Sequence, residues 1–369
     1  MKKNRITIYD IATEMRISAS TVTRALNGKS GVSDELRQAI VARAREVGYQ
    51  TNRLAKSLSR DTVKIAMMVN NRISDFHGSV IAGAKKALQE LSDFNVEGQF
   101  QMISCNDLRN NVLAELHKLE SEHVDGIVFV PNVRYAYDDA IHALVQQGIA
   151  VGTVIVDCDN DEVAFSVGPD CLRAGRLAAD IFHMNGFQEG AEVMIMQGFA
   201  NLRNHQECVE GFRAQNEKYH FNIVDVLQHY DDANLAYEVT KRFLIEVPTV
   251  RGIYCCTGIS APACRAVCDL DMQDSVRVIG TEVTKEVIPY IESGLMLATM
   301  FQDPFQQGKK AFRKMYEYIE GGKRKEAHRV FPSIPKSCWM EIWIITANGL
   351  TKLMRMTLKS SDNHESFHS

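Results

Sequence analysis

Hydrophobic positions recur at helical spacing over the first fifty residues, in three short segments separated by capping and turn residues. Thr7, with Asp10 three residues later, is suited to start a first helix through a capping box. Ser18 is suited to cap a second helix over residues 19–26, and Ser33 a third. Two short helices joined by a tight turn predict a helix-turn-helix, whose second helix fits the major groove of DNA.

The second predicted helix carries small and polar residues where a core helix would carry large apolar ones. These residues are Ala19, Ser20, Thr21, Thr23 and Arg24. The third helix instead has one apolar face, which predicts packing against the first two helices. That face contains Leu36, Ile40, Ala44 and Val47.

Charge along the chain is uneven in a way that fits this interpretation. Residues 1–62 contain twelve Lys and Arg against six Asp and Glu, whereas residues 63–369 contain 30 against 40. The basic charge is therefore confined to the N-terminus, as binding to a polyanion requires.

The N-terminal residues resemble the LacI/GalR family of bacterial transcription regulators. The matching elements are Thr7–Ala12, Ile17–Ser18, Thr21–Asn27, Val32–Ser33, Arg37, Gly48–Tyr49, Asn52, Ala55 and Leu58. Thr23 replaces the usual Ser of the recognition helix and keeps its hydroxyl. The resemblance implies that operator DNA is bound by Thr7, Ser18, Ala19, Ser20, Thr21, Thr23, Arg24, Asn27, Tyr49, Asn52, Arg53, Ala55 and Leu58. It also implies that residues 52–59 become helical on operator DNA, where Leu58 enters a minor-groove step.

From residue 63 the pattern changes to apolar runs alternating with helical segments. Predicted strands are VKIAMMV, QFQMIS, DGIVFV, AVGTVIV, EVMIMQ, FNIVDVL, GIYCC, VRVIG, LATMFQ and a last run, MEIWIIT. Predicted helices cover 78–91, 108–122, 135–147, 170–184, 204–217, 232–246, 260–269, 285–293 and the segment AFRKMYEYIEGG. Repeated βα units predict parallel sheets covered on both faces, and this length predicts two subdomains with a cleft between them.

This alternation resembles the periplasmic-binding-protein type I core of the same family. The expected organisation is an all-α helix-turn-helix domain over 1–50, a hinge helix over 51–62, an α/β sensor core over 63–349 and a tail over 350–369. The two interleaved subdomains of the core are expected to meet near residues 165 and 302, because the βα pattern restarts around AFSVGP.

Ligands of open α/β sheets bind outside the carboxyl ends of the strands, so polar and aromatic residues following each strand are candidates. With the resemblance, this rule selects Phe76, His77, Asp157, Arg203, Asn204, Glu282 and Gln302 for effector binding. Carboxylates and amides suit a sugar or polyol, because each can take two hydroxyls in a fixed geometry.

Two positions depart from the family pattern. Cys208 stands where an arginine is usual, and Thr257–Gly258 replaces an Asn–Asp pair. Because both departures remove common sugar contacts, a non-sugar ligand such as a nucleobase, or a regulator without an effector, remains an alternative.

Composition excludes several other classes. No apolar run approaches eighteen residues, and the start MKKNRITIYD lacks a signal-peptide core, so we expect a cytoplasmic protein that does not enter a membrane. Nine cysteines, an odd number, favour free thiols. There is no CxxC pair, P-loop, GxGxxG or GxSxG motif, so neither a cofactor, a metal site nor an enzyme is expected.

Together these features predict a ligand-responsive regulator that binds operator DNA as a homodimer and acts as a repressor. One alternative is an α/β enzyme with the N-terminus as a targeting module, which the missing catalytic constellation disfavours. The other is a solute-binding protein of a transport system, which the basic N-terminus disfavours.

Overall fold

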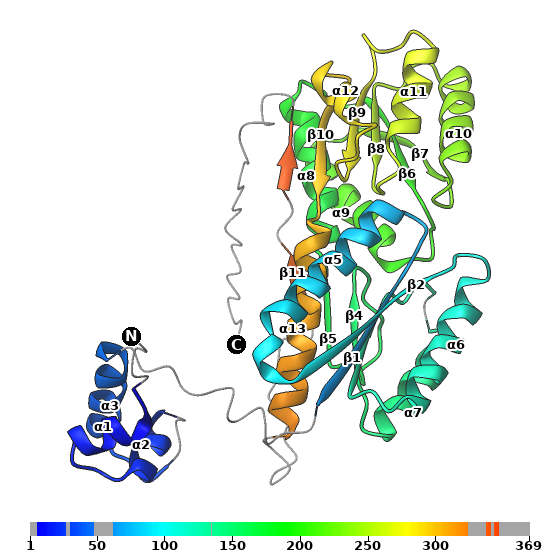
Figure 1. The fold of residues 1–369 in the computed structure, drawn as a ribbon. Helices are drawn as coiled ribbons and strands as arrows, with labels where there is room; N and C mark the ends of the chain where they lie inside the picture. The colour runs from blue at the N-terminus through cyan, green and yellow to red at the C-terminus, as the bar shows by residue number, and fades with distance from the viewer. Residues whose placement is uncertain are drawn as a thin grey trace, which may run out of the picture. The chain divides into compact units, whose positions relative to one another are not determined.

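The computed structural model describes residues 6–26, 30–47, 62–133, 135–323, 337–340 and 343–346. These residues form an N-terminal helical domain and an α/β core that begins at Val63 (Figure 1). Residues 51–61 of the expected hinge and the expected tail over 350–369 lie outside the described residues. So do the predicted DNA-binding residues Asn27, Tyr49, Asn52, Arg53, Ala55 and Leu58.

The N-terminal domain consists of α1 (Ile8–Glu14), α2 (Ala19–Leu26) and α3 (Asp34–Glu46). Its small core is formed by residues from all three helices. These are the buried side chains of Ile11, Ala12, Val22, Ala25, Ile40 and Ala44, with Leu36 and Val47 packed against them. The predicted apolar face of the third helix is confirmed, since all four of its residues belong to this core.

The first subdomain of the core is built on a six-stranded sheet with the order β11-β5-β4-β3-β1-β2. Its strands are β1 (Val63–Asn70), β2 (Val96–Ile103), β3 (Gly126–Phe129), β4 (Ala150–Val154), β5 (Phe165–Pro169) and β11 (Ser337–Met340). The associated helices are α5 (Ser74–Glu90), η1 (Ser92–Phe94), α6 (Leu108–Ser121), α7 (Asp138–Gln146) and α13 (Pro304–Lys323). Helices α6 and α7 bury one face of the sheet, and α5 and α13 pack on it from the other (Figure 1).

The second subdomain repeats this plan with the strand order β12-β10-β9-β8-β6-β7. Its strands are β6 (Glu192–Gln197), β7 (Asn222–Gln228), β8 (Gly252–Cys255), β9 (Arg277–Thr281), β10 (Met296–Phe301) and β12 (Trp343–Ile345). Its helices are α8 (Cys171–Met184), α9 (Arg203–Asn216), α10 (Ala233–Glu246), α11 (Ala261–Asp269) and α12 (Ile288–Glu292). All strand pairs in the described residues are parallel except β10–β12.

The chain passes between the subdomains more than once. The strand around AFSVGP, expected to restart the pattern, is β5, which pairs with β4 in the first sheet. The first passage therefore follows Pro169 rather than residue 165, and a second follows Phe301, near the expected 302. The single last strand predicted over MEIWIIT was wrong: β11 joins the first sheet and β12 the second.

Other differences concern element ends. Helix α5 begins at Ser74, four residues earlier than expected, because its first turn is polar and carries Asp75, which suits a helix N-terminus. Strand β2 begins at Val96, three residues earlier than expected. It lies at the sheet edge and is only partly buried, so its first residues include polar ones and do not form the continuous apolar run that predicts a buried strand.

Glycines permit two close helix crossings, one in each subdomain. A Cβ on Gly83 of α5 would lie 1.8 Å from the Phe305 carbonyl oxygen, and one on Gly308 of α13 the same distance from the Val80 oxygen. In the other subdomain, a Cβ on Gly211 of α9 would lie 2.0 Å from the carbonyl oxygen of an α8 residue. Such backbone-to-backbone approach fixes the helix pairs rigidly against their sheets.

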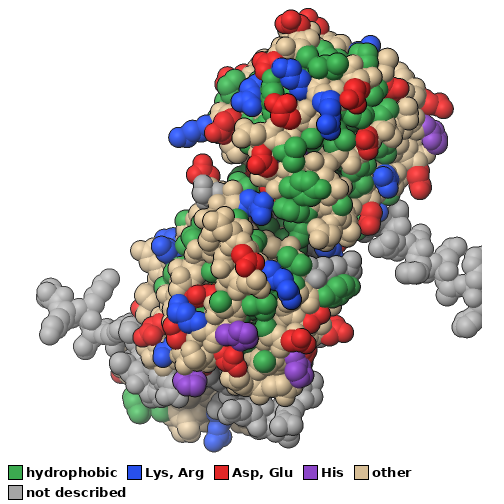
Figure 2. Space-filling model, turned by 90° about the vertical axis from the view of Figure 1, so that its right-hand side faces the viewer, with side chains coloured by type: hydrophobic (Ala, Val, Ile, Leu, Met, Phe, Trp, Pro, Cys, Tyr) green, Lys and Arg blue, Asp and Glu red, His purple; other side chains and the backbone are tan. Residues whose placement is uncertain are grey.

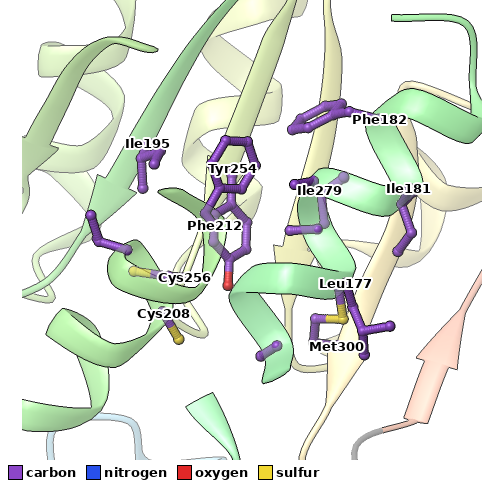
Figure 3. Close-up of a cluster of buried hydrophobic side chains, with 14 of the residues drawn as sticks. Leu177, Ile181, Phe182, Ile195, Cys208, Phe212, Tyr254, Cys256, Ile279 and Met300 are labelled. Carbon is purple, nitrogen blue, oxygen red and sulfur yellow. The ribbon is translucent and has the colours of Figure 1, made fainter. Parts of the chain in front are cut away.

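The apolar core between α8, α9 and the second sheet includes three cysteines, Cys171, Cys208 and Cys256, of which Figure 3 labels the last two. Cys208 of α9 and Cys256, which follows β8, are 2% and 3% exposed and lie side by side among Phe212, Tyr254 and Ile279. The eight cysteines whose side chains the structure describes are free, as predicted. No cluster of His, Cys, Asp or Glu in those residues is arranged to hold a metal ion.

Charged side chains of both signs are interspersed over the face of the molecule shown in Figure 2. None of the described helices is long and apolar enough to cross a membrane.

Candidate functional site

The N-terminal domain forms a helix-turn-helix whose helix starts are capped by side chains. Thr7 and Asp10 make the predicted capping box at α1. At α2 the Thr21 amide donates to Ser18 Oγ at 3.1 Å, and at α3 the Leu36 amide donates to Ser33 Oγ at 3.3 Å. These bonds satisfy amides that have no partner within their helix, and they fix where each helix begins.

Helix α2 buries Val22 and Ala25 and turns its polar side outward. Ser20, Thr23 and Arg24 are exposed on that side. A helix with small polar residues and an arginine on its free face can approach base edges and phosphates closely.

Helix α3 holds the other two helices through charged side chains. Arg37 donates to the Ala25 carbonyl oxygen of α2 at 3.3 Å. Arg43 forms ion pairs with Glu14 of α1 and with Glu46 on its own helix. The polar face of α2 is thereby presented on a fixed three-helix frame.

In the core, a cavity of about 410 Å³ lies between the two subdomains. Its lining residues follow the carboxyl ends of strands from both sheets, where α/β folds bind ligands. From the first subdomain they include Asn70, Arg72, Phe76, His77, Asp107, Arg109, Asn132 and Ile155. From the second they include Phe199, Asn204, His205, Asp231, Cys256, Thr257, Gly258, Thr281, Glu282 and Gln302.

Two oxygen atoms of cavity-lining residues are buried without a hydrogen-bond partner among the described residues. They are Asn204 Oδ1 and Asp231 Oδ1. By contrast, Asn70 and Asn132 on the opposite wall bond each other, with Nδ2 of Asn70 3.0 Å from Oδ1 of Asn132. Buried acceptors without partners are costly, and both of these belong to residues of the second subdomain that line the cavity.

His77 adds an acceptor from the first subdomain. Its Nδ1 lies 2.9 Å from the Ile73 carbonyl oxygen, which can only accept, so Nδ1 carries the proton. Burial lowers the pKa of His77, so the ring is neutral at physiological pH and its Nε2 keeps a free lone pair.

Two residues at the ends of cavity-forming strands have a strained backbone. Ile155, after β4, and Glu282, after β9, have φ angles of 71° and 67°. A left-handed conformation costs on the order of 1–3 kcal/mol at a non-glycine residue, and most at a β-branched one. Both residues line the cavity, so the strained backbone lies where it sets the direction of cavity-lining side chains.

Two arginines bridge the subdomains. Arg72 of the first donates to the Tyr230 carbonyl oxygen of the second at 2.9 Å and lies 5.0 Å from the Phe199 ring centroid. Arg203 at the start of α9 reaches back to Asp157 at 3.3 Å and to Asp159, both of which follow β4. These contacts join the two subdomains across the cleft.

We expect Arg203→Ala to lower the free energy of unfolding of the core by about 1 kcal/mol, because three half-buried carboxylates lose their partner. Urea denaturation followed by circular dichroism measures this change, which should shrink in high salt. The control is Arg313→Ala, whose bond to Glu90 joins two helices of a single subdomain. Equal losses in the two variants would argue against a special role for the bridge.

The structure brings together five of the seven residues predicted to contact an effector. Phe76, His77, Asn204, Glu282 and Gln302 line the cavity. Asp157 and Arg203 do not line it and instead pair with each other, because their charges are satisfied across the subdomain boundary. We therefore leave these two out of the ligand set.

Sequence reasoning missed Asp231, which follows β7 as the other candidates follow their strands. The rule that selects polar residues after each strand also selects Asp231, because it lies three residues after the end of β7. Cys208, where the resemblance places an arginine, is buried in the apolar core and does not line the cavity.

Comparison with known families agrees with both parts of the chain. Residues 65–323 match the model of the periplasmic binding protein domain, and residues 7–52 match the model of bacterial regulatory proteins of the lacI family. The chain belongs to the LacI family. Its N-terminal domain is thus a DNA-binding domain of a transcription regulator, and its core is a sensor domain of the sugar-binding type.

Relatives of this LacI-family chain include regulators and binding proteins. The HTH-type transcriptional regulator pepR1 of Lactobacillus delbrueckii subsp. lactis is 22% identical over 339 residues, 90% of this chain and 96% of its own. The Ribose operon repressor of Halalkalibacterium halodurans is 24% identical over 263 residues, 69% of this chain and 72% of its own. The ribose import binding protein RbsB of Escherichia coli is 24% identical over 272 residues, which are 73% of this chain and 88% of its own. These relatives are not enzymes, and the enzymatic alternative is set aside.

Solved structures share the fold of the core. The glucose-galactose binding protein GanP of Geobacillus stearothermophilus has a TM-score of 0.70 at 23% identity, covering 79% of this chain and 100% of its own. A solute binding protein of Burkholderia graminis in complex with D-arabinose has a TM-score of 0.71 at 20% identity, covering 80% of this chain and 100% of its own. The two-subdomain architecture predicted from the sequence is confirmed.

Proposed function

We propose that this LacI-family regulator is a repressor whose affinity for operator DNA is controlled by a small polyhydroxylated ligand, a sugar or polyol. One observation carries the ligand class: the cavity of about 410 Å³ has buried, unpartnered oxygens at Asn204 and Asp231. Its volume lies within the roughly 300–1,000 Å³ of small-molecule sites. A ligand rich in hydroxyls supplies the donors that these oxygens lack.

Three relatives support the proposal by their names. One is a ribose operon repressor, one binds glucose and galactose, and one was solved with D-arabinose. All concern small sugars. The proposed ligand contacts in this chain are Phe76, His77, Asn204, Asp231, Glu282 and Gln302.

The proposed DNA-bound form is a homodimer. A single helix-turn-helix makes too few base contacts for a selective site, whereas two related by a two-fold axis read two half-sites. On each half-site, Ser20 and Thr21 would face base edges and Arg24 the phosphates or groove. Ligand binding would shift the packing of the subdomains and so change the separation of the two DNA-binding domains.

DNA binding should weaken steeply with salt. For six or more phosphate contacts, raising the salt from about 50 to 200 mM should cost on the order of a thousandfold in affinity. Arg24→Ala should weaken binding and flatten this dependence, because a released counterion is lost with each phosphate contact. Fluorescence anisotropy on a DNA site selected from a random library by the full chain measures both effects.

The matched control is Lys86→Ala, which removes a positive charge from helix α5 of the core. It should leave the affinity and its salt dependence unchanged. Undiminished operator binding by a chain lacking residues 1–62 would overturn the DNA-binding role of the N-terminus.

The ligand is tested by a thermal-shift screen of pentoses, hexoses, polyols and nucleobases against the full chain. We expect hits among the first three groups, each of which should also change operator affinity. Hits confined to nucleobases would overturn the polyol proposal and favour a non-sugar effector.

A further inference from the structure

The carboxyl group of Glu282 lies in the cavity wall without an opposite charge. The side chain is 7% exposed, and its Oε1 accepts the Gln302 amide hydrogen at 3.0 Å. Among the described residues, no Lys, Arg or His nitrogen lies within 4.0 Å of this carboxyl. One oxygen of the group therefore has no partner other than what the cavity contains.

We propose that Glu282 binds the ligand as a neutral carboxylic acid, donating its O–H to a ligand oxygen, so that the cleft selects an uncharged polyol and releases it at alkaline pH. This inference rests on the proposed function, since it states how the same cavity binds its ligand. It reverses the role expected from the sequence, in which the group accepts from sugar hydroxyls as a carboxylate.

Burial is the main support for the neutral form. Burial raises the pKa of Glu282 most, the Gln302 amide lowers it and the Asp303 carboxylate raises it, so that the pKa lies at about 8. The group is therefore protonated at physiological pH. A buried carboxyl without a cation is far cheaper to keep neutral than ionised.

The other groups around the cavity do not supply the missing charge. Besides Glu282, the titratable residues that line it are Arg72, His77, Cys105, Asp107, Arg109, His205, Asp231 and Cys256, and Asp303 directly follows the lining residue Gln302. Arg72 is held by Tyr230 and Phe199 across the cleft.

Two nearby histidines and a cysteine also stay neutral through the relevant pH range. Burial lowers the pKa of His77. It also lowers the pKa of His229, which is hydrogen-bonded to Thr257, to about 4. The pKa of Cys256 lies well above its ordinary value, mainly through its bond to Cys208. A change in ligand affinity between pH 7 and 9 that disappears with Glu282 therefore reports this carboxyl.

The pattern of donors and acceptors explains the selection of an uncharged ligand. Asn204 Oδ1, Asp231 Oδ1 and the Nε2 of His77 all accept, whereas Glu282 donates. Hydroxyl groups satisfy both kinds of partner, because each donates one hydrogen and keeps two lone pairs. An ammonium cannot accept the Glu282 hydrogen.

Gly258, where the family usually has Asp, carries no side chain, and a Cβ there would lie 3.6 Å from Glu282 Cγ. No second carboxylate crowds the group from that position.

The experiment is isothermal titration of D-ribose, D-arabinose, D-glucose and D-galactose into the full chain between pH 6 and 9.5. For a sugar that binds, we expect constant affinity from pH 6 to 7 and a loss approaching tenfold per pH unit above 8, because only the protonated form binds. Glu282→Gln should bind within about threefold of wild type at pH 7 with a flat profile, since its amide donates as the acid does.

The control is Glu286→Gln, which neutralises an exposed carboxyl four residues away and should keep the wild-type profile. A flat wild-type profile, or binding by Glu282→Gln that is more than thirtyfold weaker at pH 7, would overturn the inference.

The ligand-free chain supplies an independent measurement through infrared difference spectra against Glu282→Gln. A carboxylic-acid C=O band at pH 7 that is lost by pH 9 is expected, and an ionised Glu282 at pH 7 overturns the inference. If no sugar binds but that band is present, the proposed ligand class fails while the neutral acid stands.

Discussion

Gly308→Ala is expected to cost the core more than about 3 kcal/mol of its free energy of unfolding. The added methyl group would lie 1.8 Å from the Val80 carbonyl oxygen, an atom of the α5 backbone that no side-chain rotation can move. Helix α13 would have to lift from α5 and from the strands beneath it. Since the total stability of a domain is about 5–15 kcal/mol, this is a large share. Urea denaturation followed by far-ultraviolet circular dichroism measures the loss.

The same substitution elsewhere on α13 provides the control. Gly321→Ala adds a methyl group with no atom within 4 Å, so the usual helix propensity should dominate. We expect this variant to be more stable than wild type by up to about 1 kcal/mol. Opposite signs at the two positions are the expected result, and a Gly308→Ala variant as stable as wild type would show that the helices do not cross closely there.

Val22→Asp should abolish DNA binding while leaving the sensor core folded. Val22 is fully buried in a core of only six buried side chains, from three short helices. A core of this size supplies at most about 3–5 kcal/mol, which an unpaired buried carboxylate exceeds. Anisotropy with operator DNA should show no specific binding, and the thermal unfolding of the core and its ligand affinity should match wild type.

Gln38→Asp, at an exposed position of α3, introduces the same charge without entering the core. It should reduce DNA affinity modestly through electrostatics alone. Val22→Ala should fall between the two in domain stability, by about 1–3 kcal/mol relative to wild type. Operator binding that survives Val22→Asp would contradict the described packing of α2.

The sequence predicted the elements well where local chemistry decides them. Capping side chains set the starts of the first three helices, and Thr7 and Ser18 cap as expected. The buried parallel strands read as continuous apolar runs, because both faces of each sheet are covered. What failed was sheet membership: β5, β11 and β12 are assigned to a sheet by pairing with strands far away in the sequence. No local pattern encodes that pairing.

The candidate site was predictable to the same degree. Position after a strand placed Glu282 and His77 on the cavity wall, since that rule follows from topology. It did not show that Asp157 pairs with Arg203, because an ion pair between residues 46 positions apart depends on how the two subdomains pack. Nor does the local sequence show that the pKa of Glu282 is raised, because that shift depends on the burial of the side chain in the folded core.

The interleaved connectivity has a consequence for synthesis of the chain on the ribosome. Strands β1, β3, β4 and β5 emerge early, yet the helix that packs across them, α13, follows all of the second subdomain except β12. A nascent chain must therefore carry, uncovered, the part of this apolar sheet face that α5 does not cover until residues 304–323 have been made, and β11 completes the sheet later still. The first subdomain cannot fold to completion during translation ahead of the second. Both mature together near the end of elongation, so stalling or truncation before α13 leaves an aggregation-prone intermediate.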